Sequence, residues 1–106
     1  MKILLDECVP KDLRLSFVGH ECQTVPKAGF AGKKNGELLT LAEAAGFDVL
    51  VTVDRGLPYQ QNLTGRKIAL LVISAVSNKL NDMLPHVPAC LRALPSLEPG
   101  QIVRVS

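Results

Sequence analysis

The segment KILLDE, residues 2–7, decides the expected fold, because its apolar run stops abruptly at two adjacent carboxylates. Asp6 and Glu7 repel each other and resist burial, whereas the residues before them favour it. The segment FDVLVTVD, residues 47–54, repeats this pattern with β-branched residues and ends at Asp54. Both segments predict short buried strands, each of which ends at an acid.

Further elements alternate along the chain. In NGELLTLAEAAG, residues 35–46, apolar residues recur with helical spacing, with Asn35 as candidate N-cap and Gly46 as candidate C-terminal stop. More strands are predicted within residues 19–25, 67–76 and 101–105, and more helices after Pro10 and over residues 77–94, where Pro85 and Pro88 should divide the helix. Strands that alternate with helices predict an α/β fold with a mostly parallel central sheet and right-handed crossovers.

Length and composition narrow the class of protein. At 106 residues, with 47% hydrophobic and 21% charged residues, the chain is expected to form a single globular domain over residues 1–106. The net charge of +2 is too small to drive nucleic-acid binding by itself. Three cysteines without a C-x-x-C pair indicate reduced, packed thiols. Because no apolar stretch approaches the roughly 18 to 20 residues of a membrane span, we expect a cytoplasmic protein without a membrane partner.

The two strand-ending acids form the first candidate site. In parallel sheets, ligands bind outside the carboxyl ends of the strands, where Asp6 and Asp54 are both expected. Neighbouring strands run about 5 Å apart, so one divalent cation could contact both carboxylates, and oxygen ligands favour Mg²⁺ or Mn²⁺. The alternative for either acid alone is a structural one, capping of the helix or turn that follows.

Other polar residues join this prediction with structural alternatives of their own. Glu7 should point away from Asp6 and support the site or the next helix, while Glu37, in a first helical turn, is equally suited to the helix dipole. Phosphate and sugar contacts are predicted for two loops, through Lys33, Lys34, Arg55, Gln61 and Asn62. Solvated surface lysines and loop-bracing amides are the alternatives. The apolar segment at residues 83–97 would support a homodimer if it were exposed, but core packing is its expected use.

Two stretches, MKILLDECVP and NGELLTLAEAAGFDVLVTVDRGLPYQQN, resemble the DUF5615 family of PIN-like proteins. The order of parts is similar: a first strand ending in Asp-Glu, an acid-bearing helix, and a strand ending in Thr-x-Asp, here Thr52 and Asp54. The resemblance implies a PIN-like three-layer α/β/α domain. It also implies a metal-dependent ribonuclease, often the toxin of a toxin–antitoxin pair, in which acids hold Mg²⁺ or Mn²⁺ for phosphodiester hydrolysis.

The chain departs from that family pattern in two places. Relatives usually carry Asp where this chain has Asn35, and a second acid or aromatic residue where it has RGLPY. The expected acidic cluster is therefore thinner. Asn35 can still offer a carbonyl oxygen, and Glu37 can substitute for the missing acid.

Three hypotheses follow for the function. The first is a small Mg²⁺- or Mn²⁺-dependent RNA endonuclease with Asp6, Asp54 and Glu37 as catalytic residues, the same three and Asn35 as metal ligands, and Glu7 and Thr52 as supporting residues. The second is a non-catalytic PIN-like module that binds RNA or a protein partner such as a cognate antitoxin. The third is a receiver-like phosphoacceptor domain. Such a domain is expected to carry a lysine directly after a late strand, whereas Lys79 follows the predicted strand at residues 67–76 but not immediately.

Overall fold

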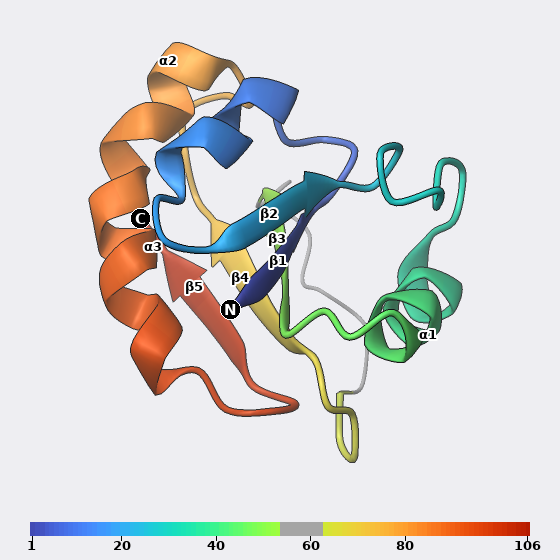
Figure 1. The fold of residues 1–106 in the computed structure, drawn as a ribbon. Coiled ribbons are helices and arrows are strands. Elements are labelled where there is room, and N and C mark those ends of the chain that lie inside the picture. Colours follow the sequence, from blue (N-terminus) through green and yellow to red (C-terminus); the bar gives the residue numbers. More distant parts are fainter. Residues whose placement is uncertain (54–62) are drawn as a thin grey trace.

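The chain folds around a single five-stranded sheet in which every strand pair is parallel (Figure 1). The structure, a computed structural model, describes residues 1–53 and 63–106. The strand order is β2-β1-β3-β4-β5. The predicted α/β fold with a parallel central sheet is confirmed. The strands are β1 (Lys2–Leu5), β2 (Glu21–Thr24), β3 (Val49–Val53), β4 (Ala69–Ile73) and β5 (Ile102–Val105).

Helices cover both faces of the sheet (Figure 1). Helix α1 lies on one face, whereas η1, α2 and α3 lie on the other. Within residues 1–53 and 63–106, no helix combines the length and the apolar character that crossing a membrane requires. The helical elements are η1 (Lys11–Ser16), α1 (Asn35–Ala44), α2 (Leu80–Met83), η2 (Leu84–His86), α3 (Val87–Ala93) and η3 (Leu94–Ser96).

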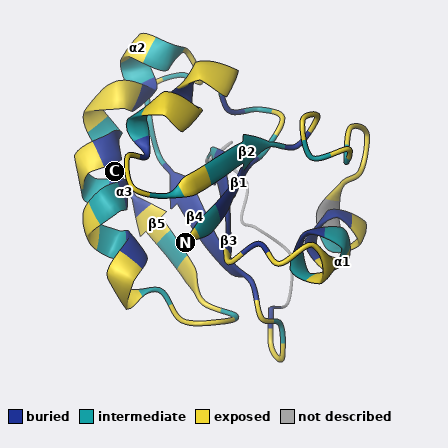
Figure 2. Cartoon of the chain, viewed as in Figure 1, coloured by how far each residue is buried: buried dark blue, intermediate teal, exposed yellow. Residues whose placement is uncertain are grey.

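Alternating side chains of the strands feed two separate cores. Ile3 and Leu5 of β1 pack with η1, α2 and α3, whereas Leu4 between them packs with α1. Strand β4 is buried along its whole length, as Figure 2 shows, because its residues are covered on both faces. This burial explains the continuous apolar run that the sequence carries there. The sheet is therefore the middle of three layers.

The carboxy-terminal helices belong to this core. Pro85 and Pro88 lie in the first turns of η2 and α3, so the prolines divide the segment as predicted. Met83, Val87 and Cys90 are each at most 5% exposed and pack in the same core as β1. The apolar residues of 83–97 thus serve mainly in core packing.

The two ends of α1 show how the sequence sets its length. The helix begins at Asn35 and Lys34 is its N-cap, so the prediction of Asn35 as N-cap is wrong by one residue. At the other end, Gly46 adopts φ +87°, and two bonds from Gly46 N–H to Glu43 O and from Phe47 N–H to Ala42 O close a Schellman motif. Gly46 therefore ends the helix as predicted.

The path of the chain reverses direction between β1 and β3. From β1 the chain passes to β2 on one side, and it returns through α1 to β3 on the other side. This reversal makes the carboxyl ends of β1 and β3 the topological switch point, where ligands bind in open parallel sheets. The candidate binding site therefore lies at the residues that follow Leu5 and Val53.

One connection departs from the expected handedness. Leu13 of the β1–β2 connection and Met83 of the β4–β5 connection lie in the same core, on the same face of the sheet. The two connections step across the sheet in opposite directions, so they have opposite hands. The expectation that all crossovers are right-handed is therefore wrong for one of them, which is rare in parallel sheets.

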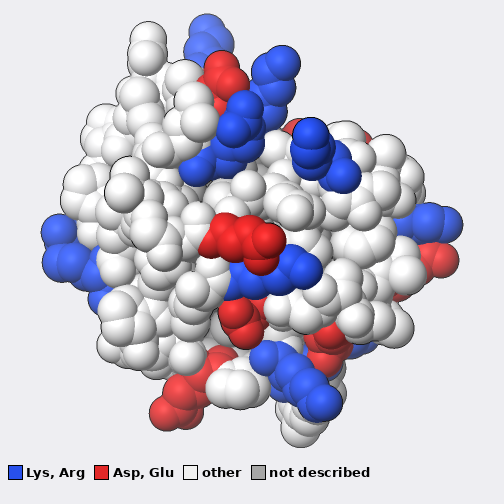
Figure 3. All heavy atoms as spheres, viewed as in Figure 1, with Lys and Arg blue, Asp and Glu red and all other residues white. Residues whose placement is uncertain are grey.

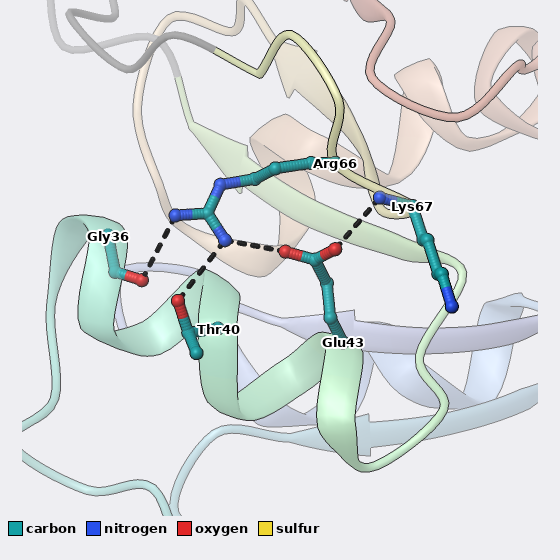
Figure 4. Close-up of polar contacts among 5 residues, drawn as sticks. All are labelled: Gly36, Thr40, Glu43, Arg66 and Lys67. Carbon is teal, nitrogen blue, oxygen red and sulfur yellow. Dashed lines mark hydrogen bonds and ion pairs between the residues drawn. The ribbon is translucent and has the colours of Figure 1, made fainter.

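A polar cluster fixes α1 to the segment that enters β4 (Figure 4). The Arg66 guanidinium donates to the Glu43 carboxylate, to Thr40 Oγ1 at 3.2 Å and to the Gly36 carbonyl at 3.5 Å. The Lys67 backbone N–H donates to the second Glu43 oxygen at 2.8 Å. These side chains are shielded, with Glu43 18% and Arg66 24% exposed. Arg66 thus lies along one stripe of α1 and clamps the helix to the sheet.

We expect this cluster to make stability depend on acid pH. The hydrogen bond from the Lys67 backbone lowers the pKa of Glu43 most, and Arg66 lowers it further, against the opposing effect of burial. The stabilisation is fully present above the ordinary glutamate pKa of about 4.3 and is lost as the pH falls through the lower folded-state pKa. In urea unfolding between pH 7 and pH 3, the free energy of unfolding of Glu43→Gln should depend less on pH than that of the native chain. If Glu98→Gln, at an exposed side chain, reduced the pH dependence equally, Glu43 would not be its specific source.

Candidate functional site at the carboxyl edge of the sheet

Asp6 is held at the switch point by backbone bonds to strand β3 and to the turn that follows β1. Its N–H donates to the Val51 carbonyl of β3 at 2.9 Å, continuing the register that pairs Leu5 with Val51. Its own carbonyl accepts the Val9 N–H at 3.0 Å, which turns the chain toward η1. This geometry places Asp6 beside Thr52, the next residue along β3.

The carboxylate of Asp6 is oriented by two donors. The Thr52 hydroxyl donates to Oδ2 at 2.8 Å, and the Glu7 backbone N–H donates to Oδ1 at 2.8 Å. Thr52 is only 5% exposed, whereas Asp6 is partly exposed. Because each carboxylate oxygen can accept more than one hydrogen bond, both oxygens keep a lone pair for a ligand. The site therefore presents a fixed carboxylate that solvent can reach.

The Thr52 hydroxyl also lies near a thiol. Its Oγ1 is 3.5 Å from Cys8 Sγ, and the Cys8 carbonyl accepts a hydrogen bond from the Asn78 side chain at 3.2 Å. Asn78 comes from the turn after β4, and its position at this edge was not predicted from the sequence. Only the parallel pairing of β3 with β4 brings that turn here. The polar pair Ser77-Asn78 before α2 is the signal that could have indicated it.

Glu7 points to the other side of β1. Its Oε1 accepts the backbone N–H of Gly32 at 3.0 Å, in the loop that follows β2. Lys33, the next residue, lies 3.8 Å from the exposed carboxylate of Glu37 in α1. Exposed pairs of this kind contribute little to stability, so Lys33 and Glu37 can exchange partners readily.

The predicted site residues thus fall into three groups. Asp6 and Thr52 are brought into direct contact, and Glu7 is adjacent but engaged with Gly32. Glu37 is paired with Lys33, and in the described part of the chain no hydrogen bond or ion pair joins it to Asp6. For Asn35 only the backbone is described, as the first residue of α1. Asp54, Arg55, Gln61 and Asn62 lie outside the described residues.

The donor set suits a hard cation in part. Carboxylate and hydroxyl oxygens at the end of β1 and β3 are the ligand type that Mg²⁺ and Mn²⁺ prefer. Among the described residues, no group of three or more His, Cys, Asp or Glu side chains is placed to hold a metal ion. Asp6 therefore fits a metal as one ligand, and it would need partners that the described part of the chain does not supply as a cluster.

The cysteines away from this edge are packed thiols. Burial raises the pKa of both Cys22 and Cys90 to about 11, with Arg14 opposing the shift at Cys22. Both therefore remain protonated near neutral pH and are poor nucleophiles. Neither forms a disulfide.

Comparisons of the chain with known protein families, curated proteins and solved structures found no match. The resemblance to the DUF5615 family therefore stays a prediction from motifs, and the functional argument depends on the residues of this chain.

We expect the Thr52–Asp6 hydrogen bond to be energetically significant, because the donor is buried and the acceptor is charged. In a double-mutant cycle of Thr52→Val with Asp6→Ala, urea unfolding should give a coupling free energy of about 1.5–3 kcal/mol. The matched cycle of Thr52→Val with Asp12→Ala, at an exposed acid on η1, should be additive. A coupling near zero for Thr52 with Asp6 would show that the hydroxyl does not fix the carboxylate.

Proposed function

We propose that this protein is a small metal-dependent RNA endonuclease of PIN-like type, with Asp6 at the centre of its active site. The observation that supports this proposal most is the partly exposed Asp6 carboxylate, fixed by the buried Thr52 hydroxyl at the switch point of a parallel sheet. An acid that served only to cap a turn would not need a buried side-chain donor from the neighbouring strand. A pre-oriented carboxylate suits a metal ligand.

In this proposal each residue has a defined task. Asp6 offers one lone pair to Mg²⁺ or Mn²⁺, while Thr52 keeps the carboxylate from rotating. Asp54, Glu37 and Asn35 are proposed to complete the ligand set. When bound, the metal would supply activation of water and stabilisation of charge on the phosphodiester. Closing the site around RNA would require Glu37 to leave Lys33, a small cost for an exposed pair.

RNA contact is proposed for the loop that bears Lys33 and Lys34, joined by Arg55, Gln61 and Asn62. Both lysines are exposed and precede or cap the start of α1, on the strand-end side of the fold. On the face drawn in Figure 3 basic and acidic side chains are interspersed, and the net charge of the chain is only +2. Binding would therefore be local and would weaken with salt as these phosphate contacts are screened.

A non-catalytic module is the second candidate, and one observation favours it. Within residues 1–53 and 63–106, Asp6 belongs to no group of three or more His, Cys, Asp or Glu side chains that could hold a metal ion. A domain of this kind would bind RNA or a protein partner, such as the antitoxin of a toxin–antitoxin pair, without hydrolysis. In the nuclease proposal the same antitoxin would restrain the enzyme.

The receiver-like hypothesis is less well supported. The strand order is the one that receiver domains use. However, right-handed crossovers would put the β4–β5 helices on the face of α1, whereas α2 and α3 pack on the opposite face. Lys79, the lysine proposed for this role, does not follow β4 directly, because β4 ends at Ile73 and Lys79 is the N-cap of α2.

We expect cleavage of RNA to depend on Asp6. With Mn²⁺ or Mg²⁺ and a pool of single-stranded RNA, Asp6→Asn should lower the cleavage rate at least about 100-fold, beyond what loss of a supporting residue costs a metal site. Asp12→Asn, at an exposed acid on η1, is the matched control and should cleave as the native chain does.

Three results would contradict the nuclease proposal. They are equal cleavage by Asp6→Asn and the native chain, cleavage that persists with a chelator, and RNA or partner binding by the native chain without cleavage in either metal. The last result would favour the non-catalytic module. Circular dichroism should first show that both variants fold.

A further inference from the structure

The loop between β2 and α1, residues 25–34, is tied to the end of β1 by the side chain of Glu7. Its Oε1 accepts the Gly32 N–H at 3.0 Å. Gly32 adopts φ +81°, a backbone conformation that glycine reaches without strain and that other residues rarely adopt. The contact joins segments that are distant in sequence and leaves the two lysines immediately after it.

The rest of this loop has its own support. The Phe30 N–H donates to the Val25 carbonyl at 3.0 Å, and the Lys33 N–H donates to the Phe30 carbonyl at 3.0 Å. The Phe30 ring packs edge-on against Phe47, with ring centroids 6.5 Å apart, and contacts the core under α1. The loop is thus anchored to the core by the Phe30 side chain and, two residues later, to the end of β1 by Glu7.

The adjacent acids therefore act on opposite neighbours of β1. Asp6 receives its side-chain donor from β3, whereas Glu7 receives its donor from the loop after β2. This arrangement relieves the repulsion between the two adjacent carboxylates, because each of them is paired with a different donor. It also makes Glu7 a link between the Asp6 site and the lysine-bearing loop.

We propose that Glu7 is a positioning residue for RNA binding, which holds Lys33 and Lys34 beside the Asp6 site through the Gly32 amide. The proposal rests on the function proposed above, because it assigns the lysines to the phosphates of the same RNA. Glu7 acts in it as a hydrogen-bond acceptor, and its charge is not what matters.

The test separates these two properties by comparing three variants. Fluorescence anisotropy with a labelled single-stranded RNA should give about fivefold weaker binding for Glu7→Ala, the effect of losing one hydrogen bond. Glu7→Gln keeps an acceptor oxygen and removes a negative charge, so it should bind at least as tightly as the native chain. Glu21→Ala removes an exposed acid at the opposite end of β2 and is the matched control. The expected order of affinity is Gln, then native, then Ala.

Tighter RNA binding by Glu7→Ala than by the native chain would overturn the proposal. If Glu7 were only a surface acid, removing its charge would strengthen binding of an anionic RNA, and Glu7→Ala would bind more tightly than the native chain. Hydrogen exchange of the Gly32 amide gives a readout independent of RNA. Exchange should accelerate in Glu7→Ala and stay native in Glu7→Gln, and unchanged exchange in Glu7→Ala would overturn the link even if Asp6-dependent cleavage is found. Failure of the native chain to bind RNA, with the exchange pattern as expected, would instead overturn the RNA role and the proposed function with it.

Discussion

The hydrogen bond from Thr52 to Asp6 joins the two central strands at the place where the sheet topology reverses. It depends on the parallel register of β1 and β3, which sets Asp6 beside Thr52 and gives both residues backbone partners. That register in turn depends on the two cores, because alternate residues of each strand are committed to opposite layers. A shift by one residue would move Ile3 and Leu5 into the layer that Leu4 occupies, and it would separate Asp6 from Thr52.

The adjacent acids after β1 illustrate how one sequence feature can serve two neighbours. Asp6 faces β3 and Glu7 faces the loop after β2, so the end of β1 organises both sides of the carboxyl edge. The ion pair between Arg66 and Glu43 holds α1 against the segment that enters β4. The position of the Lys33–Glu37 pair is thereby set by two polar contacts, one at the loop and one along the helix.

Much of the fold could be predicted because its signals are local. Apolar runs gave the strands, Gly46 gave the end of α1, and Pro85 and Pro88 gave the division of the last helical segment. The exceptional crossover could not be predicted, since no local residue encodes the face on which α2 and α3 pack. At the site, Asp6 was found because an acid after a buried run is conspicuous, whereas Asn78 and the Gly32 amide depend on contacts between distant segments.

We propose above all that Asp6, oriented by Thr52, is a ligand of a divalent cation at this edge. Titration of isotope-labelled protein with Mn²⁺, followed by amide NMR, tests it most directly, because a paramagnetic ion broadens signals near its site. The account predicts that the amides around Asp6 and Thr52 broaden first, and that Asp6→Asn abolishes this selectivity while the remaining spectrum stays native. Uniform weak broadening, or selective broadening that Asp6→Asn does not change, would contradict the account.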